Sequence, residues 1–249
     1  MVELFDRSTV GLGSCERLGV RDLGGSGVGG SRQTGGMTTL SDVLATGTAS
    51  ARLRAVMAAG TTPDPADLDV LVEQCAVEPD FQVREMLTWA LIRLPAERVV
   101  PRVLPELERQ EAQARSQALH TLSKIGDGSV YPQVAERLGD IDPGVVRTAW
   151  RAAVVLVPDD GRADLARRLA VQLGQGDCET HLALSRALVG IGADVVEPVL
   201  EDAAGRGEAV RTHAADTARL LHDASAGASL ALERARREVA LGRTRSAKG

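Results

Sequence analysis

The sequence predicts an all-α protein, a right-handed α-solenoid built from about six helix-turn-helix repeats. Hydrophobic residues make up 44% of the 249 residues, but aromatic residues only 2%. The core must therefore consist mainly of Leu, Val, Ala and Ile, which suits close packing of helices better than a β-sandwich. A pattern centred on arginine also returns about every 32 residues, and self-similarity at such a period is typical of stacked repeats.

Residues 1–36 come first and show no sustained hydrophobic period. They hold ten of the 26 glycines, and the run GSGVGG at Gly25–Gly30 matches the G-x-G-x-x-G fingerprint of dinucleotide-binding sites. That fingerprint works between a strand and a helix, and the flanking GVRDLG and SRQTGG predict neither. We therefore expect a disordered, glycine-rich extension, non-native or from an upstream translation start. The stretch from Met37 resembles a natural beginning, with Ser41 placed to cap a helix.

Residues 37–223 are predicted to form the repeat array, in which six segments share one anchor position. Hydrophobic residues recur one position before the anchor and three, seven and ten positions after it. These offsets lie on one face of an α-helix, so each segment is predicted to be an amphipathic helix. The anchors are Arg52, Arg84, Arg115, Arg147, His181 and Arg211.

A second helix is predicted between each pair of anchor helices. Pro101, Pro132 and Pro198 are expected at the starts of three of them, where the missing N–H is harmless. Short turns rich in Gly, Asp and Pro, such as GDG and DIDPG, separate the two sets. Residues 224–242 predict a C-terminal capping helix that closes the stack, and residues 243–249 a disordered tail.

Three stretches of the array resemble HEAT repeats, especially the shorter HEAT-like repeats of the phycobilisome-lyase type: DPGVVRTAW, ALHTLSKIGDGSVYPQV and ALVGIGADVVEPVL. The resemblance covers about residues 50–223 and concerns the residues that build the repeat, so it implies the fold more strongly than a function. Two alternatives follow from it. One is a bilin lyase or chaperone-like protein, and the other is a HEAT-like DNA glycosylase or nucleic-acid binder.

Five of the anchors, all arginines, are interpreted as a structural ladder. An acidic residue precedes each of the last five anchors by three to five positions, where a carboxylate can cap the helix. The arginine one turn later can pair with it or with the carboxylate of the next repeat. Exposed pairs contribute only about 0.2–1 kcal/mol each, so the expected use is register between repeats. The ladder residues are Arg52, Arg84, Arg115, Arg147 and Arg211.

The concave face of such an array is where a partner is expected to bind. Trp89, His120 and Arg186 occupy the fifth position after their anchors, and Glu85 the first position after its anchor. These offsets flank the core face, so the four residues are predicted to form a recognition stripe. The competing interpretation is that Trp89 packs against a neighbouring helix and the others are solvated.

No residue is predicted to be catalytic, and no cofactor or metal is expected. The chain contains no G-x-S-x-G, H-E-x-x-H or Walker sequence,. Cys15, Cys75 and Cys178 are too far apart for a zinc cage, and C-x-x-H at Cys178 and His181 has no second pair. The sequence therefore favours a non-enzymatic scaffold or adaptor that binds another protein.

The net charge of −5 is unevenly distributed. Residues 37–223 carry −9 and residues 224–249 carry +4. An acidic body makes a nucleic-acid partner unlikely and favours a basic protein or peptide. Because no signal peptide or membrane span is evident, we expect a cytoplasmic protein. We also expect a monomer. The composition is typical of a GC-rich bacterial genome.

Overall fold

The computed structural model describes residues 39–223, which belong to the second of two units, Met1–Met37 and Thr38–Gly249. All regular elements in the described range are helical, with twelve α-helices, six short 3-10 helices and no strand. The prediction of an all-α protein is therefore confirmed for this range. The extension expected at residues 1–36, the capping helix at 224–242 and the tail at 243–249 lie outside the described residues.

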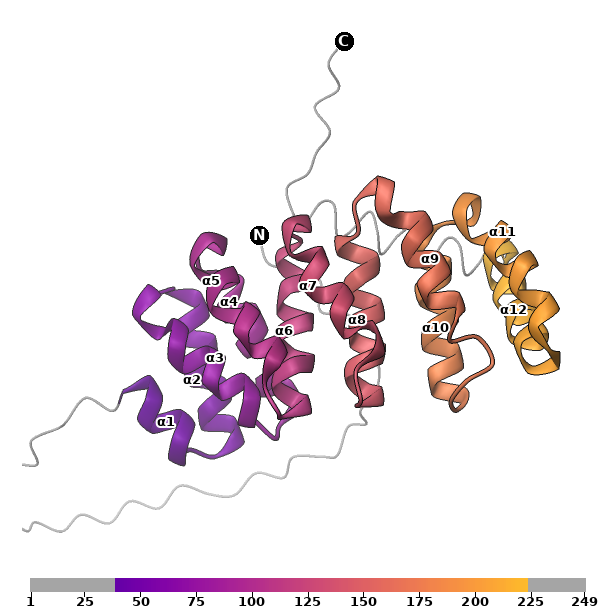
Figure 1. Ribbon diagram of the computed structural model, residues 1–249. Coiled ribbons are helices and arrows are strands. Elements are labelled where there is room, and N and C mark those ends of the chain that lie inside the picture. The colour runs from indigo at the N-terminus through magenta and orange to yellow at the C-terminus, as the bar shows by residue number, and fades with distance from the viewer. Residues whose placement is uncertain (1–38, 224–249) are drawn as a thin grey trace, which may run out of the picture. The chain divides into compact units, whose positions relative to one another are not determined.

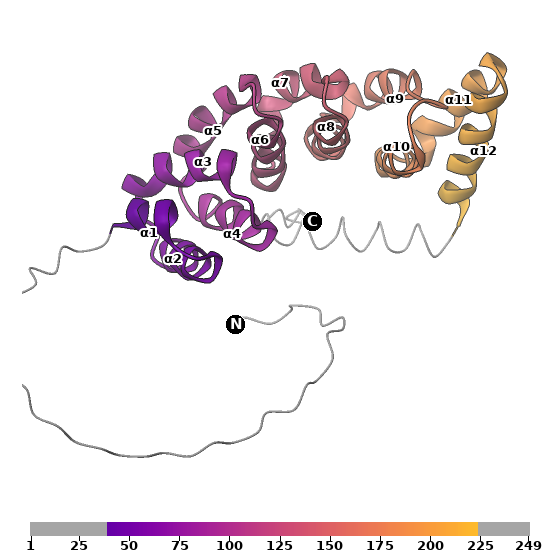
Figure 2. The same cartoon turned by 90° about the horizontal axis from the view of Figure 1, so that it is seen from below.

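Six helices form one layer, which we call the inner layer because α4, α6, α8 and α10 lie along the inside of the arc seen in Figure 2. Each of the six packs against the next one in the chain (Figure 1). This order brings the anchor residues of successive segments onto neighbouring helices. The inner layer consists of α2 (Ala49–Thr61), α4 (Phe81–Leu91), α6 (Ala112–Ile125), α8 (Pro143–Leu156), α10 (Cys178–Ile191) and α12 (Glu208–His222).

The intervening helices form the outer layer, in which α3, α5, α7 and α9 lie along the outside of the same arc (Figure 2). Several continue into a short 3-10 helix before the chain turns back. The outer layer consists of α1 (Leu40–Thr46), α3 (Leu68–Val77), α5 (Ala96–Val103), α7 (Tyr131–Glu136), α9 (Arg162–Ala170) and α11 (Ala193–Ala203). The 3-10 helices are η1 (Pro65–Asp67), η2 (Leu104–Glu108), η3 (Gly128–Val130), η4 (Arg137–Gly139), η5 (Asp159–Gly161) and η6 (Ala204–Arg206).

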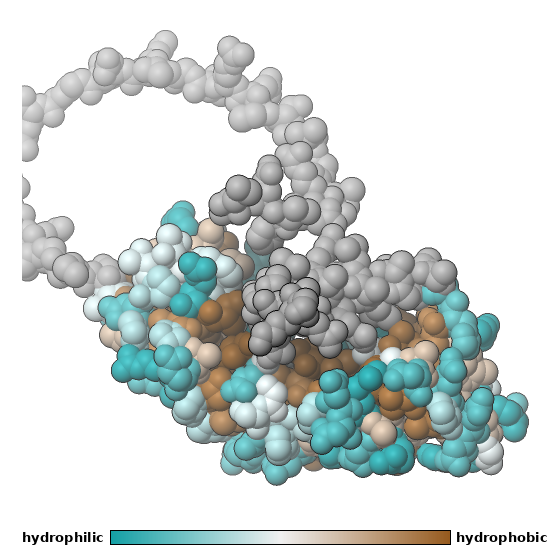
Figure 3. Space-filling view, turned by 90° about the horizontal axis from the view of Figure 1, so that it is seen from above, coloured by the Kyte–Doolittle hydropathy of each residue, from teal (hydrophilic) through white to brown (hydrophobic). Residues whose placement is uncertain are grey.

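The hydrophobic core lies between the two layers. Leu87, Leu119 and Leu184 of the inner layer and Leu165 of the outer layer are all at most 1% exposed. Trp150, three positions after the anchor Arg147, is buried as that offset predicts, and its indole N–H donates to the carbonyl of Leu138 at 3.1 Å. Seen from above, hydrophobic residues gather along the middle of the array, and hydrophilic residues line its edges (Figure 3).

Carboxylates begin three of the inner helices, as expected for N-caps. The side chain of Asp80 accepts from the backbone N–H of Val83, and Asp142 and Asp177 cap α8 and α10 in the same way. These bonds satisfy N–H groups that have no partner inside the helix. Glu111 occupies the cap position of α6 without such a bond.

Two of the three predicted proline positions are wrong. Pro132 does lie in the first turn of α7, but Pro101 and Pro198 lie inside α5 and α11. Both helices begin several residues before their proline, α5 directly after Pro95 and α11 directly after Gly192. A proline inside a helix removes one backbone hydrogen bond. The offset pattern did not reveal that each of these two helices begins before its proline.

Candidate functional site

A groove crosses the inner layer in the middle of the array, on helices α4, α6 and α8. Two of the predicted partner residues, Glu85 and His120, line it. The other two, Trp89 and Arg186, do not. We call this feature the central groove; its lining residues are Phe81, Arg84, Glu85, Ala112, Gln113, Ser116, Gln117, His120, Asp142, Gly144, Val145, Thr148 and Arg151.

His120 of α6 is the groove's least satisfied polar side chain. Its Nε2 lies 3.4 Å from Oε1 of Glu85, but this buried nitrogen has no hydrogen bond to the described residues. Burial lowers the pKa of His120, and the nearby charges of Lys124 and Arg151 lower it further, against the opposing effect of Glu85. The imidazole is therefore neutral at neutral pH and keeps an unused position for a hydrogen-bond partner.

Arg151 of α8 brings an unpaired positive charge to the same groove. The guanidinium donates to Oγ1 of Thr148 at 3.2 Å and is otherwise exposed. Thr148 in turn lies 3.1 Å from the hydroxyl of Ser116 and donates to the carbonyl of Gly144. A hydroxyl does not neutralise a guanidinium, so the positive charge of Arg151 remains available to a ligand.

Phe81 and Arg84, at the start of α4, form the apolar end of the groove. The ring of Phe81 is 65% exposed, and the guanidinium of Arg84 lies 5.8 Å from its centroid. Arg84 is held in place because it donates to the carbonyls of Glu78 and Pro79, both at 2.8 Å. An exposed aromatic ring beside a fixed cation is a suitable surface for an apolar side chain.

Trp89 and Arg186 occupy other surroundings. Trp89 is half-buried and packs on α2, so closely that a Cβ on Gly60 would lie 2.1 Å from its ring. This contact matches the competing interpretation, a tryptophan that packs against a neighbouring helix. Arg186 is exposed on α10 and has no ion pair among the described residues.

Two of the ladder arginines form buried ion pairs with the next segment. Arg52 donates to both oxygens of Glu78, at 2.8 and 2.6 Å, and Arg115 to both oxygens of Asp140, at 2.9 and 2.7 Å. Although burial opposes it, these bonds hold the pKa of Glu78 and that of Asp140 below their ordinary values. Paired guanidinium–carboxylate bonds fix the register of the two segments.

The carboxylates of these pairs stand two residues before the capping residue, which sequence reasoning missed. Glu78 and Asp140 each accept from the backbone N–H of the cap that follows, Asp80 and Asp142. The signal was present in the spacing Glu-x-Asp and Asp-x-Asp. Only the acidic residues next to the helix starts were expected as partners of the arginines, so the residue two positions earlier was not singled out.

Two further ladder arginines, Arg84 and Arg147, lack this partner, because the equivalent positions hold Arg109 and Gln175. Arg84 therefore turns to backbone carbonyls, as described above. Arg147 lies 3.5 Å from an exposed carboxylate oxygen of Glu179. Arg211 is exposed without an ion pair in the described range.

A buried polar cluster joins α10 and α12, and sequence reasoning missed it as well. Nδ1 of His213 accepts from the backbone N–H of Gly174 at 3.1 Å, so the proton of the neutral ring resides on Nε2. Nε2 lies 3.0 Å from the carbonyl of His181 and 3.1 Å from the hydroxyl of Ser185, which also contacts Thr217. Burial lowers the pKa of His213, so the ring stays neutral and structural,.

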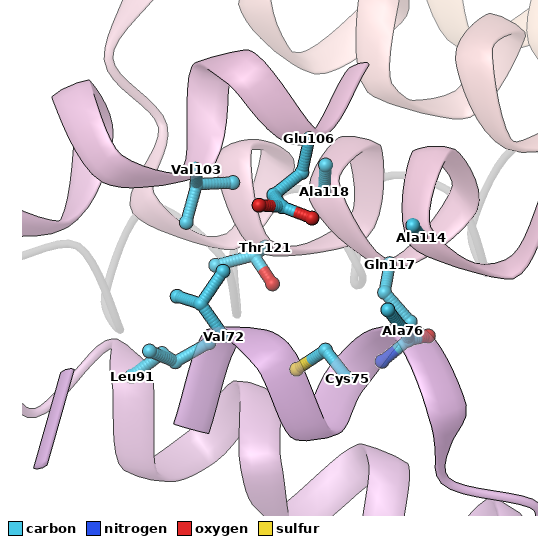
Figure 4. A pocket seen from close by; sticks show the side chains of 10 residues that line it. All are labelled: Val72, Cys75, Ala76, Leu91, Val103, Glu106, Ala114, Gln117, Ala118 and Thr121. Carbon is cyan, nitrogen blue, oxygen red and sulfur yellow. The ribbon is translucent and has the colours of Figure 1, made fainter. Parts of the chain in front are cut away.

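A small pocket between the layers, at α3, η2 and α6, is a second concave feature with polar groups (Figure 4). Cys75, Glu106, Gln117 and Thr121 line it together with apolar side chains. Burial raises the pKa of the Cys75 thiol to about 12, so the thiol is protonated and a poor nucleophile,. One oxygen of Glu106 accepts from Arg102 at 2.7 Å. The pocket is therefore part of the core packing.

The charges of residues 39–223 are separated between the layers. The inner-layer helices contain ten Arg and Lys and four Asp and Glu, a net charge of +6. The whole range contains 19 and 28, a net charge of −9, so everything outside the inner helices carries −15. Five inner-layer cations are exposed and have no ion pair within the described range: Arg54, Lys124, Arg151, Arg186 and Arg211.

The chain matches no protein-family model and none of the curated proteins. Within residues 39–223, no helix has the length and hydrophobicity that a membrane span requires. The same residues contain no group of three or more His, Cys, Asp or Glu side chains placed to hold a metal ion.

Proposed function

We propose that this protein is a non-enzymatic scaffold or adaptor, a right-handed α-solenoid of HEAT-like repeats that holds a partner protein on its inner layer. The observation that carries the proposal is the separation of charge. With Arg52 and Arg115 neutralised by the buried carboxylates of Glu78 and Asp140, the inner-layer helices still carry +4 and the rest of the described range −13. This difference distinguishes the inner layer electrostatically from the rest of the surface. Such a face orients a charged partner as it approaches.

Exposed hydrophobic side chains support the same face. Met57 of α2, Phe81 of α4 and Leu182 of α10 are each more than 40% exposed. Mixed apolar and cationic surfaces, with aromatic and arginine side chains, are typical of protein interfaces. The inner layer therefore combines the two kinds of contact that a stable protein partner needs.

The expected charge of the partner changes with this separation. The basic partner expected from the sequence rested on the charge of the body as a whole. A partner on the inner layer meets the local charge instead, because interactions beyond about 10 Å are screened by salt. The local charge favours an acidic partner.

A comparison of charge-reversed variants tests the proposal. The full chain, a Lys124→Glu, Arg151→Glu variant of the inner layer and a matched Arg98→Glu, Arg167→Glu variant of the outer layer are used as baits in lysate. Proteins captured by the full chain are identified, purified and titrated against all three baits. We expect one partner to bind the full chain and the outer-layer variant alike and the inner-layer variant at least about tenfold more weakly.

Two outcomes would contradict the proposal. A partner that binds the inner-layer variant as well as the full chain places the site elsewhere. If no captured protein binds the purified full chain directly, the protein is not a scaffold. Melting curves of the three proteins show that the substitutions leave the fold intact.

The positive inner layer also favours a second candidate, nucleic-acid binding, which the resemblance had already suggested. Phosphate neutralisation needs a basic face, and five exposed inner-layer cations have no ion pair within the described range. Against it, four acidic residues lie on the same helices and the remainder carries −15. Nucleic acid is therefore included as a competing ligand in the experiment below.

A further inference from the structure

We propose that the central groove binds an acidic segment of a partner protein, with a carboxylate placed between His120 and Arg151 and an apolar side chain against Phe81. The inference rests on the proposed function and names the chemistry of the partner. It depends on three features of the groove: an unused hydrogen-bonding position, an unneutralised charge and an exposed ring.

The first feature is the imidazole of His120. Its buried Nε2 has no hydrogen bond to the described residues, and a buried polar atom without a partner destabilises the free protein,. Nδ1 or Nε2 can carry the proton of a neutral ring, and a ligand carboxylate is an acceptor for an Nε2–H. A carboxylate in the groove therefore satisfies an atom that the free protein leaves unsatisfied.

The second feature is the positive field around that ring. Burial lowers the pKa of His120, and Glu85 at 3.4 Å raises it. Lys124 on the same helix and Arg151 on α8 lower this pKa further. Asp142 also lines the groove, but its carboxylate is occupied by the backbone N–H groups that it caps. A carboxylate entering from a partner therefore meets two cations beside the one carboxylate that is not engaged in capping, and neither cation has an ion pair to give up within the described range.

The third feature is the ring of Phe81, which lines the same groove and is 65% exposed. The cation beside it, Arg84, is already held by two backbone carbonyls. An aliphatic side chain placed on the ring removes apolar surface from water, which is favourable. A segment with acidic and aliphatic residues therefore uses both ends of the groove.

Charge complementarity selects this occupant over the chain's own ends. Residues 1–36 carry no net charge and residues 224–249 carry +4, so neither complements a cationic groove. The acidic outer layer of a second copy would complement it, which makes self-association an outcome that the test must separate.

The test uses fluorescence anisotropy with the full chain and three labelled probes. The first is a short peptide of glutamates flanking two leucines, the second the same peptide with lysine in place of glutamate, and the third a single-stranded oligonucleotide of matched charge. We expect the acidic peptide to bind and the lysine peptide to bind at least about tenfold more weakly. Tighter binding of the oligonucleotide than of the acidic peptide would overturn the inference in favour of nucleic acid.

Matched variants place the peptide on the chain. Arg151→Gln removes the charge without reversing it and should weaken acidic-peptide binding, as should His120→Ala and Phe81→Ala. Arg98→Gln on the outer layer should leave it unchanged. Equal binding by all four variants would overturn the placement. Sedimentation at the titration concentrations must show a monomer; a dimer that excludes the peptide would identify the second copy as the occupant and overturn the inference.

The two proposals fail separately. If the cellular partner is lost by the inner-layer variant but the acidic peptide does not bind, the scaffold proposal stands and the acidic segment is wrong. If the acidic peptide binds but no captured protein binds the full chain directly, the groove chemistry stands and the scaffold proposal is wrong.

Discussion

The junction of α6 with α8 and the junction of α10 with α12 begin from equivalent anchors, yet they are held by different polar interactions. Arg115 at the first junction is buried and bound to both oxygens of Asp140. The equivalent anchor at the second junction is His181, Gly205 stands two positions before the cap, and the buried polar contact there belongs to His213. The helices repeat, but the residue two positions before the cap decides which interaction joins them.

The largest effect is expected at the first junction. Replacing Arg115 with Ala leaves the Asp140 carboxylate buried without its guanidinium, which costs about 3 kcal/mol of unfolding free energy. Urea unfolding followed by circular dichroism measures this cost. Arg211→Ala, which removes an exposed anchor arginine, is the control and should change stability by no more than about 0.5 kcal/mol; similar losses in the two variants would show that the buried pair contributes nothing special.

At the second junction, His213→Ala should cost about 2 kcal/mol, because the backbone N–H of Gly174 and the hydroxyl of Ser185 lose a buried partner,. The same unfolding assay applies. Ser116→Ala, whose hydroxyl contacts Thr148 in the groove, is a milder control. A His213 variant as stable as the parent would show that the cluster contributes nothing to this junction.

Acid should also separate the two junctions. Burial lowers the pKa of His213 below that of an unfolded histidine, about 6.5,. The contribution of neutral His213 to the unfolding free energy is therefore fully present above this pH. It is lost as the pH drops toward the folded-state pKa, by at most about 1.4 kcal/mol per pH unit for one such group. Burial likewise lowers the pKa of His120, which adds to the slope.

The carboxylate of Asp140 behaves differently, since its pKa is depressed. Its contribution is present above about pH 4 and is lost only in stronger acid. Melting temperatures between pH 8 and 5 should decline more gently in His213→Ala than in the parent. Parallel curves for the two proteins would mean that His213 does not titrate differently on folding.

The smallest effect is expected from transferring this interaction to the junction of α8 with α10. Gln175→Asp places a carboxylate two residues before the cap Asp177, where Asp140 stands before the cap Asp142. Arg147 could then pair with it, for a gain of up to about 0.5 kcal/mol, because the site is exposed. Gln175→Ala, which likewise removes the existing hydrogen bond to the carbonyl of Val171 at 2.9 Å, is the control. No difference between the two would show that position alone does not create the pair.

The sequence predicted the features that depend on local spacing. Helical periodicity and the caps at Asp80, Asp142 and Asp177 are properties of short segments, and the burial of Trp150 follows from its offset. Pro101 was misplaced because turn residues, not the proline, determine where α5 begins. Local patterns could not show how far each helix extends beyond its hydrophobic face.

The features that the sequence did not predict depend on residues far apart in the chain. His213 is satisfied by Gly174, 39 positions earlier, and no pattern marks that pair. The groove around His120 likewise needs α4, α6 and α8 to be side by side before Glu85, Lys124 and Arg151 meet. The charge of the inner layer could be counted only after the helices had been assigned to layers.

Glu78 has a consequence for how the protein unfolds. It is fully buried, and its carboxylate accepts from Arg52 of α2, Gln74 of α3 and the backbone of Asp80. Its carbonyl accepts from Arg84 of α4 and Gln113 of α6. One residue thus ties four helices together, so α2, α3, α4 and α6 should open in a single cooperative step. In native-state hydrogen exchange, the slowest amide protons of these four helices would then report the same free energy of opening, as one cooperative unit and not repeat by repeat.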